Sequence, residues 1–91
     1  MKYYVYFLAS KKNNKVITYV GYTNNIVKRL NLHNSSKGAK FTRGKKWTIL
    51  YKEVYFNKSK AMSREYKLKN DRKFRNLLKD KYVKMSNNNI S

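Results

Sequence analysis

The sequence contains no cysteine and a single histidine, His33, among its 91 residues. The absence of cysteine excludes a disulfide framework and any zinc site that is built on thiolates. A single histidine also excludes the usual metal sites that several histidines form together. A metal ion bound by this chain must therefore be held by oxygen atoms.

The sequence also lacks an apolar run that is long enough to span a bilayer. Its N-terminal apolar segment, residues 3–9, is short, follows only Lys2 as a cationic lead-in, and alternates as a β-strand does. A chain of 91 residues forms one small domain with room for one site. We expect a soluble intracellular protein with no membrane partner.

Acidic residues are scarce: the sequence has 4 acidic and 23 basic residues, which gives a formal charge of +19. Such an imbalance causes self-repulsion in the folded state unless a polyanion neutralises it, so it favours DNA or RNA as a partner. A high content of lysine and asparagine is also what an AT-rich genome encodes, whatever the function of the protein. A basic membrane-surface protein is the other alternative, but no predicted helix has a large apolar face that the core does not need.

Two apolar, tyrosine-rich runs, residues 3–9 and 16–22, are separated by a polar stretch at 10–15, which predicts a β-hairpin with a six-residue connection. Alternation puts Tyr6 on one face of the first strand and Val5 and Phe7 on the other, and since both faces are apolar the strand should be central. Gly21 marks a point where the backbone passes close to another group or turns sharply. Residues 47–56 predict a third strand.

Apolar periodicity predicts three helices, at about residues 25–34, 60–70 and 72–83. The expected N-caps are Thr23 or Asn24 for the first, Asn57 or Ser59 for the second, and Asp71 for the third. The fold is therefore α+β, a three-stranded antiparallel sheet with helices packed on it, in the order β-β-α-β-α-α. Residues 1–84 form the single domain, 37–46 a basic loop, and 85–91 a disordered tail.

Few side chains could do chemistry. Arg29 and His33 are four residues apart on one flank of the first helix. Glu65 interrupts the apolar stripe of the second helix, and a buried carboxylate must be paired or bind a metal. Tyr6 and Tyr19 lie on the two hairpin strands. Taken singly, each has a structural interpretation: core tyrosines, a solvated arginine, a surface or capping histidine, and an ion pair of Glu65 with a lysine such as Lys69.

Taken together and in order, these residues resemble the GIY-YIG nuclease family, and most closely its small single-domain branch of uncharacterised proteins. The matching features span about residues 2–78. They are Tyr4-Val5-Tyr6, Tyr19-Val20-Gly21-Tyr22-Thr23, Lys28-Arg29-Leu30 with His33-Asn34, Lys37-Gly38-Ala39-Lys40-Phe41-Thr42-Arg43-Gly44, and Ser63-Arg64-Glu65 with Lys67-Leu68-Lys69.

The resemblance implies hydrolysis of phosphodiester bonds in DNA with one divalent metal, Mg²⁺ or Mn²⁺ in its place, held by Glu65. It implies that Tyr6 is the general base or orients the attacking water, with Tyr19 beside it. Arg29 would hold the scissile phosphate, and His33 would assist proton transfer or phosphate binding.

A single carboxylate suits Mg²⁺, which keeps most of its waters, and a guanidinium matches phosphate. A tyrosine with a pKa of about 10 needs help to act as a base at neutral pH.

The family asparagine that follows the glutamate has two candidates, Asn70 and Asn76. No separate DNA-binding domain is visible, so we expect low intrinsic sequence specificity, with possible selectivity for DNA structure. Affinity would come from phosphate contacts of basic residues, which give little base readout: Lys28, Lys37, Lys40, Arg43, Lys45 and Lys46. The alternative function is a nucleic-acid-binding module without turnover, and preferential binding to RNA would favour an RNA-associated protein.

Overall fold

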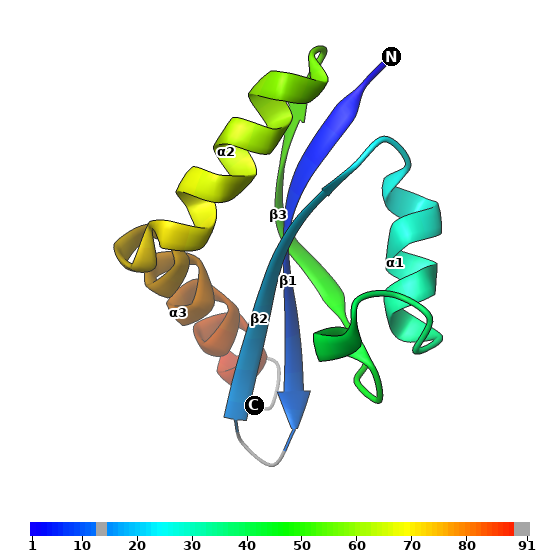
Figure 1. The fold of residues 1–91 in the computed structure, drawn as a ribbon. Helices are drawn as coiled ribbons and strands as arrows, with labels where there is room; N and C mark the ends of the chain where they lie inside the picture. The colour runs from blue at the N-terminus through cyan, green and yellow to red at the C-terminus, as the bar shows by residue number, and fades with distance from the viewer. Residues whose placement is uncertain (13–14, 89–91) are drawn as a thin grey trace.

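A computed structural model describes residues 1–12 and 15–88 of the chain (Figure 1). Its elements are β1 (Tyr3–Lys12), β2 (Lys15–Thr23), α1 (Ile26–Asn34), the 3-10 turn η1 (Lys40–Thr42), β3 (Thr48–Tyr55), α2 (Lys58–Asn70) and α3 (Arg72–Asn88). The strands form one antiparallel sheet in the order β2-β1-β3. The predicted α+β class, element order and central position of the first strand are confirmed.

The first hairpin is longer than its apolar pattern indicates. β1 continues through Ser10 to Lys12, and β2 begins at Lys15, which is paired with Lys12. The predicted connection at residues 10–15 was therefore too long at both ends, and residues 13–14 lie outside the described part of the chain. Alternation of apolar side chains stops at Ala9, while the backbone ladder continues, because backbone pairing does not require apolar side chains.

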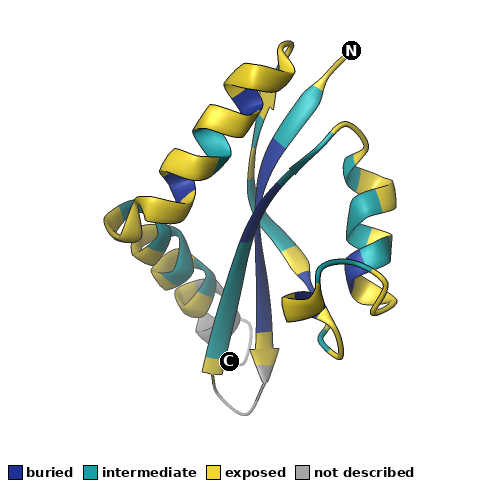
Figure 2. Ribbon diagram, viewed as in Figure 1, coloured by how far each residue is buried: buried dark blue, intermediate teal, exposed yellow. Residues whose placement is uncertain are grey.

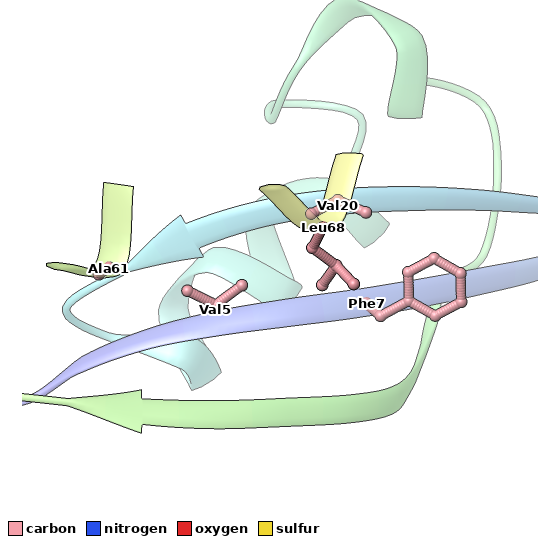
Figure 3. Close-up of a cluster of buried hydrophobic side chains, with 5 residues drawn as sticks. All are labelled: Val5, Phe7, Val20, Ala61 and Leu68. Atoms are coloured by element: carbon pink, nitrogen blue, oxygen red, sulfur yellow. The ribbon is translucent and has the colours of Figure 1, made fainter. Parts of the chain in front are cut away.

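Side chains of β1 alternate between two layers, as predicted. Val5 and Phe7 point to the face that α2 and α3 cover, where they pack with Val20, Ala61 and Leu68 (Figure 3). Tyr6 and Leu8 point to the opposite face, where they form a second buried cluster with Trp47 and the partly buried Tyr19, Ile26 and Leu30. Figure 1 shows the resulting order of layers, with α1 and the loop containing η1 on one side of the sheet and α2 and α3 on the other. The buried residues follow β1 through the middle of the molecule (Figure 2).

Side chains cap the helices at positions close to those predicted. Asn25 caps α1 by accepting a hydrogen bond from the Lys28 N–H, so the expectation of Thr23 or Asn24 was wrong by one or two residues. Asn57 caps α2 and Asp71 accepts from the N–H of Phe74 at the start of α3, as predicted.

The last helix is longer than predicted. α3 continues to Asn88 rather than ending near residue 83, so the first four residues of the expected tail are helical, and residues 89–91 lie outside the described part. Neither glycine nor proline follows to end the helix. Among residues 1–12 and 15–88, no helix is both long and apolar enough to cross a membrane.

Candidate active site

Tyr6 occupies a buried position in the middle of β1, directly opposite Gly21 of β2 in the ladder. A Cβ atom placed on Gly21 would lie 2.6 Å from Cζ of Tyr6, so the phenol ring lies against the Gly21 backbone. A side chain at this position would collide with the ring. The close approach that the sequence predicts at Gly21 is therefore made by Tyr6.

A chain of hydrogen bonds runs from Tyr6 through His33 to Thr42, and all three side chains are buried. The Tyr6 hydroxyl lies 2.9 Å from Nε2 of His33, and Nδ1 of His33 lies 2.8 Å from the Thr42 hydroxyl oxygen. The Thr42 hydroxyl donates its hydrogen to the carbonyl of Ala39 at 2.7 Å. Because that hydroxyl has one hydrogen, it accepts from His33, so Nδ1 is protonated and Nε2 accepts from the Tyr6 hydroxyl.

Burial keeps both members of the Tyr6–His33 pair neutral. It lowers the pKa of His33 below its usual 6.5, and the positive charge of Arg29 lowers it further. Burial also raises the pKa of Tyr6 above 10.0, although the nearby Arg29 opposes this shift. At neutral pH the pair is thus a protonated phenol donating to an unprotonated imidazole nitrogen.

The loop after α1 fixes the other side of His33. A Cβ on Gly38 would lie 2.5 Å from Nδ1 of His33, so the loop backbone passes close to the ring. The indole Nε1 of Trp47 donates to the carbonyl of Thr42 at 2.9 Å, and Nδ2 of Asn34 donates to the carbonyl of Trp47 at 3.2 Å. The segment predicted as a basic loop therefore contains an ordered turn that supports the histidine.

Tyr19 is brought to the same place by β2. Its ring centroid lies 5.2 Å from that of His33 and 6.5 Å from that of Tyr6. On another side Tyr19 stacks on Phe41, with the centroids 6.2 Å apart, and Phe41 is 53% exposed. Tyr19 thus contacts both the buried pair and the exposed ring of Phe41.

Arg29 lies one turn before His33 on α1, and its charge acts on both His33 and Tyr6. In the described part of the chain its Nε atom is buried and has no hydrogen-bond partner. A buried donor without an acceptor is costly, by about 1–3 kcal/mol. Arg29 therefore presents an unsatisfied cationic donor beside the Tyr6 hydroxyl.

Glu65 lies on α2, in the opposite layer. Ala61 and Leu68 are the buried residues of α2 and lie along one line on the helix. Arg64 and Glu65 lie on opposite sides of that line. Arg64 forms an ion pair with Glu53 of β3, at 2.8 Å, so Glu65 lies on the side of α2 toward β2.

The Glu65 carboxylate forms an ion pair with Lys69 at 3.0 Å, and the Glu65 side chain is 17% exposed. The negative charge of Glu65 is the smallest of the influences on the pKa of Tyr6, which it raises. Glu65 is thus within electrostatic reach of Tyr6, but among the described residues it has no hydrogen bond to the other four predicted site residues.

The described residues contain no group of three or more His, Asp or Glu side chains that could hold a metal together. Glu65 is the one acidic side chain near the site, and a lone carboxylate matches the needs of Mg²⁺, which retains its waters. Asn70 donates from Nδ2 to the carbonyl of Tyr66 at the end of α2, and Asn76 lines a cavity on α3 with Asp71 and Asp80. Neither asparagine lies with the other site residues.

Most of the basic residues predicted to bind nucleic acid are exposed: Lys28, Lys37, Lys40, Arg43 and Lys46. Lys45 is partly buried, with Nζ donating to the carbonyl of Phe41 at 3.2 Å and lying over the Phe41 ring. Sequence reasoning missed Thr42, because a threonine in a lysine-rich segment without periodicity gives no signal of its own. It also missed Lys58, which shares a cavity with Arg29.

Comparisons with known proteins identify relatives of this chain. A UPF0213 protein of Oceanobacillus iheyensis is 42% identical over 77 residues, which make up 84% of this chain and 86% of that protein. A UPF0213 protein of Staphylococcus haemolyticus is 44% identical over 69 residues, covering 75% of this chain and 80% of the relative. The solution NMR structure of a UPF0213 protein from Bacillus halodurans is 32% identical and aligns with a TM-score of 0.46, over 93% of this chain and 85% of that one.

The family described as the GIY-YIG catalytic domain matches residues 2–79, a range that includes the hairpin, α1, α2 and the five predicted site residues. This agreement extends over most of the chain. The chain therefore belongs to the GIY-YIG family of nuclease domains.

Proposed function

We propose that this protein is a metal-dependent endonuclease that hydrolyses phosphodiester bonds in DNA with low intrinsic sequence specificity. The main support is the buried Tyr6–His33–Thr42 chain beside Arg29, whose buried Nε atom has no hydrogen-bond partner among the described residues. These residues supply a proton path and a phosphate ligand in one place. Membership of the GIY-YIG family supports nuclease chemistry as the use of that site.

The proton path gives Tyr6 a route by which it could act as a base. Burial raises the pKa of Tyr6, and the nearby positive charge of Arg29, which lowers that pKa, assists the route. The Tyr6 hydroxyl already donates to Nε2 of His33, so the Tyr6 oxygen gains basicity as its proton moves to His33. That oxygen then takes a proton from the attacking water, whose oxygen forms the new bond to phosphorus. The bond to the leaving oxygen breaks, and that oxygen takes up a proton from solvent. His33 releases the proton that it received from Tyr6, so both side chains return to their starting states. Thr42 keeps Nδ1 of His33 protonated throughout.

Arg29 and a metal ion held by Glu65 would stabilise the negative charge of the phosphate during the reaction. The guanidinium of Arg29 stabilises negative charge on the phosphoryl oxygens, as a planar donor fork does. Glu65 would hold the metal, because its only ion-pair partner in the described part of the chain is Lys69, whose side chain is half exposed and easily displaced. Mg²⁺, with Mn²⁺ as a substitute, supplies positive charge to the phosphate when bound.

Low specificity follows from the composition of the surface around the site. The exposed basic residues of 37–46 would contact phosphates, which gives affinity and a steep salt dependence with little base readout. The same residues would also bind the phosphates of RNA, so substrate preference has to be measured with both DNA and RNA.

The experiment is nicking of supercoiled plasmid in Mg²⁺ or Mn²⁺. We expect Tyr6→Phe and Glu65→Ala to lose activity by about 100-fold or more. Matched controls are Tyr66→Phe, at an exposed tyrosine of α2, and Asp80→Ala, at an exposed acid of α3. Both controls should retain activity within about twofold. Equal activity of Tyr6→Phe, Glu65→Ala and the natural protein would overturn the proposal.

A second candidate function is a nucleic-acid-binding module that keeps the fold without turnover. The observation that favours it is the Glu65–Lys69 ion pair, which gives the carboxylate a partner within its own helix. It predicts tight, salt-dependent binding that is unchanged by Glu65→Ala, with no cleavage in any metal. Metal-dependent nicking that Glu65→Ala abolishes would exclude this alternative.

A further inference from the structure

Two contiguous cavities open beside Arg29, where the end of β2 meets α1. The first has a volume of about 400 Å³ and is lined by Tyr3, Tyr22, Thr23, Asn24, Arg29 and Lys58. The second, of about 240 Å³, is lined by Thr23, Asn24, Asn25, Lys28, Arg29 and Leu32. The two cavities share Thr23, Asn24 and Arg29, so they are neighbours, and we refer to the pair as the track.

The track is lined by cations and by no carboxylate. Lys28 and Arg29 come from α1, while Lys58 begins α2, which lies on the opposite face of the sheet. Basic residues from two layers thus line the same cavity, and no acidic residue is among the described residues that line the track. Their mutual repulsion favours the binding of an anion between them.

The shared residue, Arg29, also lacks a hydrogen-bond acceptor among the described residues, at its buried Nε atom. A guanidinium pairs best with an oxyanion that offers two oxygens in one plane, such as phosphate, while a lysine adds a point charge. Neither Tyr6, His33 nor Glu65 lines either cavity. A phosphate held here therefore lies beside the reacting position rather than at it.

We propose that this track binds two successive backbone phosphates of a nucleic-acid strand next to the scissile one. The guanidinium of Arg29 has five N–H donors, so it contacts both the scissile phosphate and the first of these two phosphates, which it shares with Lys58. The second phosphate lies at Lys28. The inference rests on the proposed function for the identity of the ligand as a nucleic acid. It assigns Lys58 a binding role and sets the path of the strand along the junction of β2 and α1.

The test compares Lys58→Gln with Lys60→Gln by fluorescence anisotropy of a short labelled DNA strand in EDTA. Lys60 is an exposed lysine of the same helix that lines neither cavity, so each variant removes one positive charge from α2. Lys58→Gln should raise the Kd by about fivefold and reduce the slope of log K against log salt by about one. Lys60→Gln should change the Kd by less than about twofold. Equal effects of the two variants would overturn the inference.

A second measurement uses inorganic phosphate as the probe. In ¹H–¹⁵N spectra, a phosphate titration should shift the Arg29 Nε–H signal in the natural protein and in Lys60→Gln, and should shift it much less in Lys58→Gln. An Arg29 signal that phosphate leaves unmoved in the natural protein would also overturn the inference.

Neither experiment needs turnover, so the inference and the proposed function can fail separately. A Lys58-specific loss of binding in a protein that cuts no plasmid would support the track and reject the nuclease. Plasmid nicking with identical behaviour of Lys58→Gln and Lys60→Gln would support the nuclease and reject the track.

Discussion

The Nδ1 atom of His33 lies 2.8 Å from the hydroxyl oxygen of Thr42, which donates its own hydrogen to the Ala39 carbonyl. This contact fixes the tautomer of the histidine. It leaves Nε2 free to accept a hydrogen bond from the Tyr6 hydroxyl, as proton transfer from Tyr6 to His33 requires. A residue of the basic loop thus sets the chemical state of a residue on α1.

The first prediction concerns Thr42→Val, which keeps the shape of the side chain and removes the hydroxyl. The Nδ1–H of His33 then has no acceptor, so the variant should lose about 2 kcal/mol of stability and populate the other tautomer. Because the sequence has one histidine, ¹⁵N-histidine labelling reports this imidazole alone. Thr42→Ser, which keeps the hydroxyl, should retain the Nδ1–H form. An unchanged tautomer in Thr42→Val would contradict the assignment.

The second prediction is a loss of stability in mild acid. Burial, then the charge of Arg29, lowers the pKa of His33, so the folded state resists protonation while the unfolded chain binds a proton near pH 6.5. Stability from this group is complete above about pH 6.5 and is lost as pH falls through the folded pKa. Urea unfolding at a series of pH values should show this decline, and a His33→Asn variant should lack it in the same window. An identical decline in both proteins would rule out His33 as its cause.

The resemblance selected the candidate residues Tyr6, Tyr19, Arg29 and His33, and the structure brings them together. Strand alternation and helical spacing fix the face on which each of these side chains lies once the hairpin and α1 are placed. Thr42 could not be predicted this way, since it reaches His33 through a turn that periodicity does not describe.

The two remaining site features depend on how layers pack. Glu65 was recognised as an anomaly in an apolar stripe, but the side of α2 on which it lies depends on the packing of Ala61 and Leu68 against the sheet. The pairing of Arg64 with Glu53 identifies the opposite side of the helix. Lys58 meets Arg29 only because α1 and α2 begin at the same end of the sheet, as Figure 1 shows. Such contacts depend on tertiary packing rather than on local pattern.

The third prediction concerns Gly21→Ala. The new Cβ would lie 2.6 Å from Cζ of Tyr6, so the ring must move away from His33. We expect a loss of about 2 kcal/mol in the free energy of unfolding and a broken Tyr6–His33 bond, seen in the His33 ¹⁵N signals. In a Tyr6→Ala background the same substitution should cost less than about 0.5 kcal/mol, because the collision is gone. An equal loss of stability in both backgrounds would show that it does not arise from a collision with the Tyr6 ring.

The fourth prediction concerns competition for Glu65. Lys69 forms an ion pair with the carboxylate at 3.0 Å, one helical turn away and half exposed on the lysine side. Helical pairs at this spacing contribute about 0.3–0.5 kcal/mol. Lys69→Gln should therefore lower the Mg²⁺ concentration for half-maximal plasmid nicking by about twofold. Lys67→Gln removes the same charge from an exposed position of the same helix and serves as the control. A higher Mg²⁺ requirement in Lys69→Gln would contradict a metal site at Glu65.

The opposite face of the sheet contains an ionic network that is separate from the predicted site. Glu53 accepts hydrogen bonds from Arg64 at 2.8 and 3.0 Å, from Tyr55 at 2.6 Å and from Tyr51. Burial alone would raise the pKa of Glu53, but these hydrogen bonds outweigh it and bring the pKa to about 2. The network joins β3 to α2.

The fifth prediction is that Glu53→Gln destabilises the fold without affecting nicking. Because the folded pKa lies below the usual 4.5, the stability from Glu53 is present above about pH 4.5 and is lost as pH falls toward about 2. Glu53→Gln should therefore lose about 2 kcal/mol at neutral pH and lack the decline between those values. Its plasmid nicking, measured well below the melting temperature, should match the natural protein, because Glu53 lies on the face of the sheet away from Tyr6. Lost nicking in a folded Glu53→Gln protein would show that the α2 layer, through the position of Glu65, is coupled to this network.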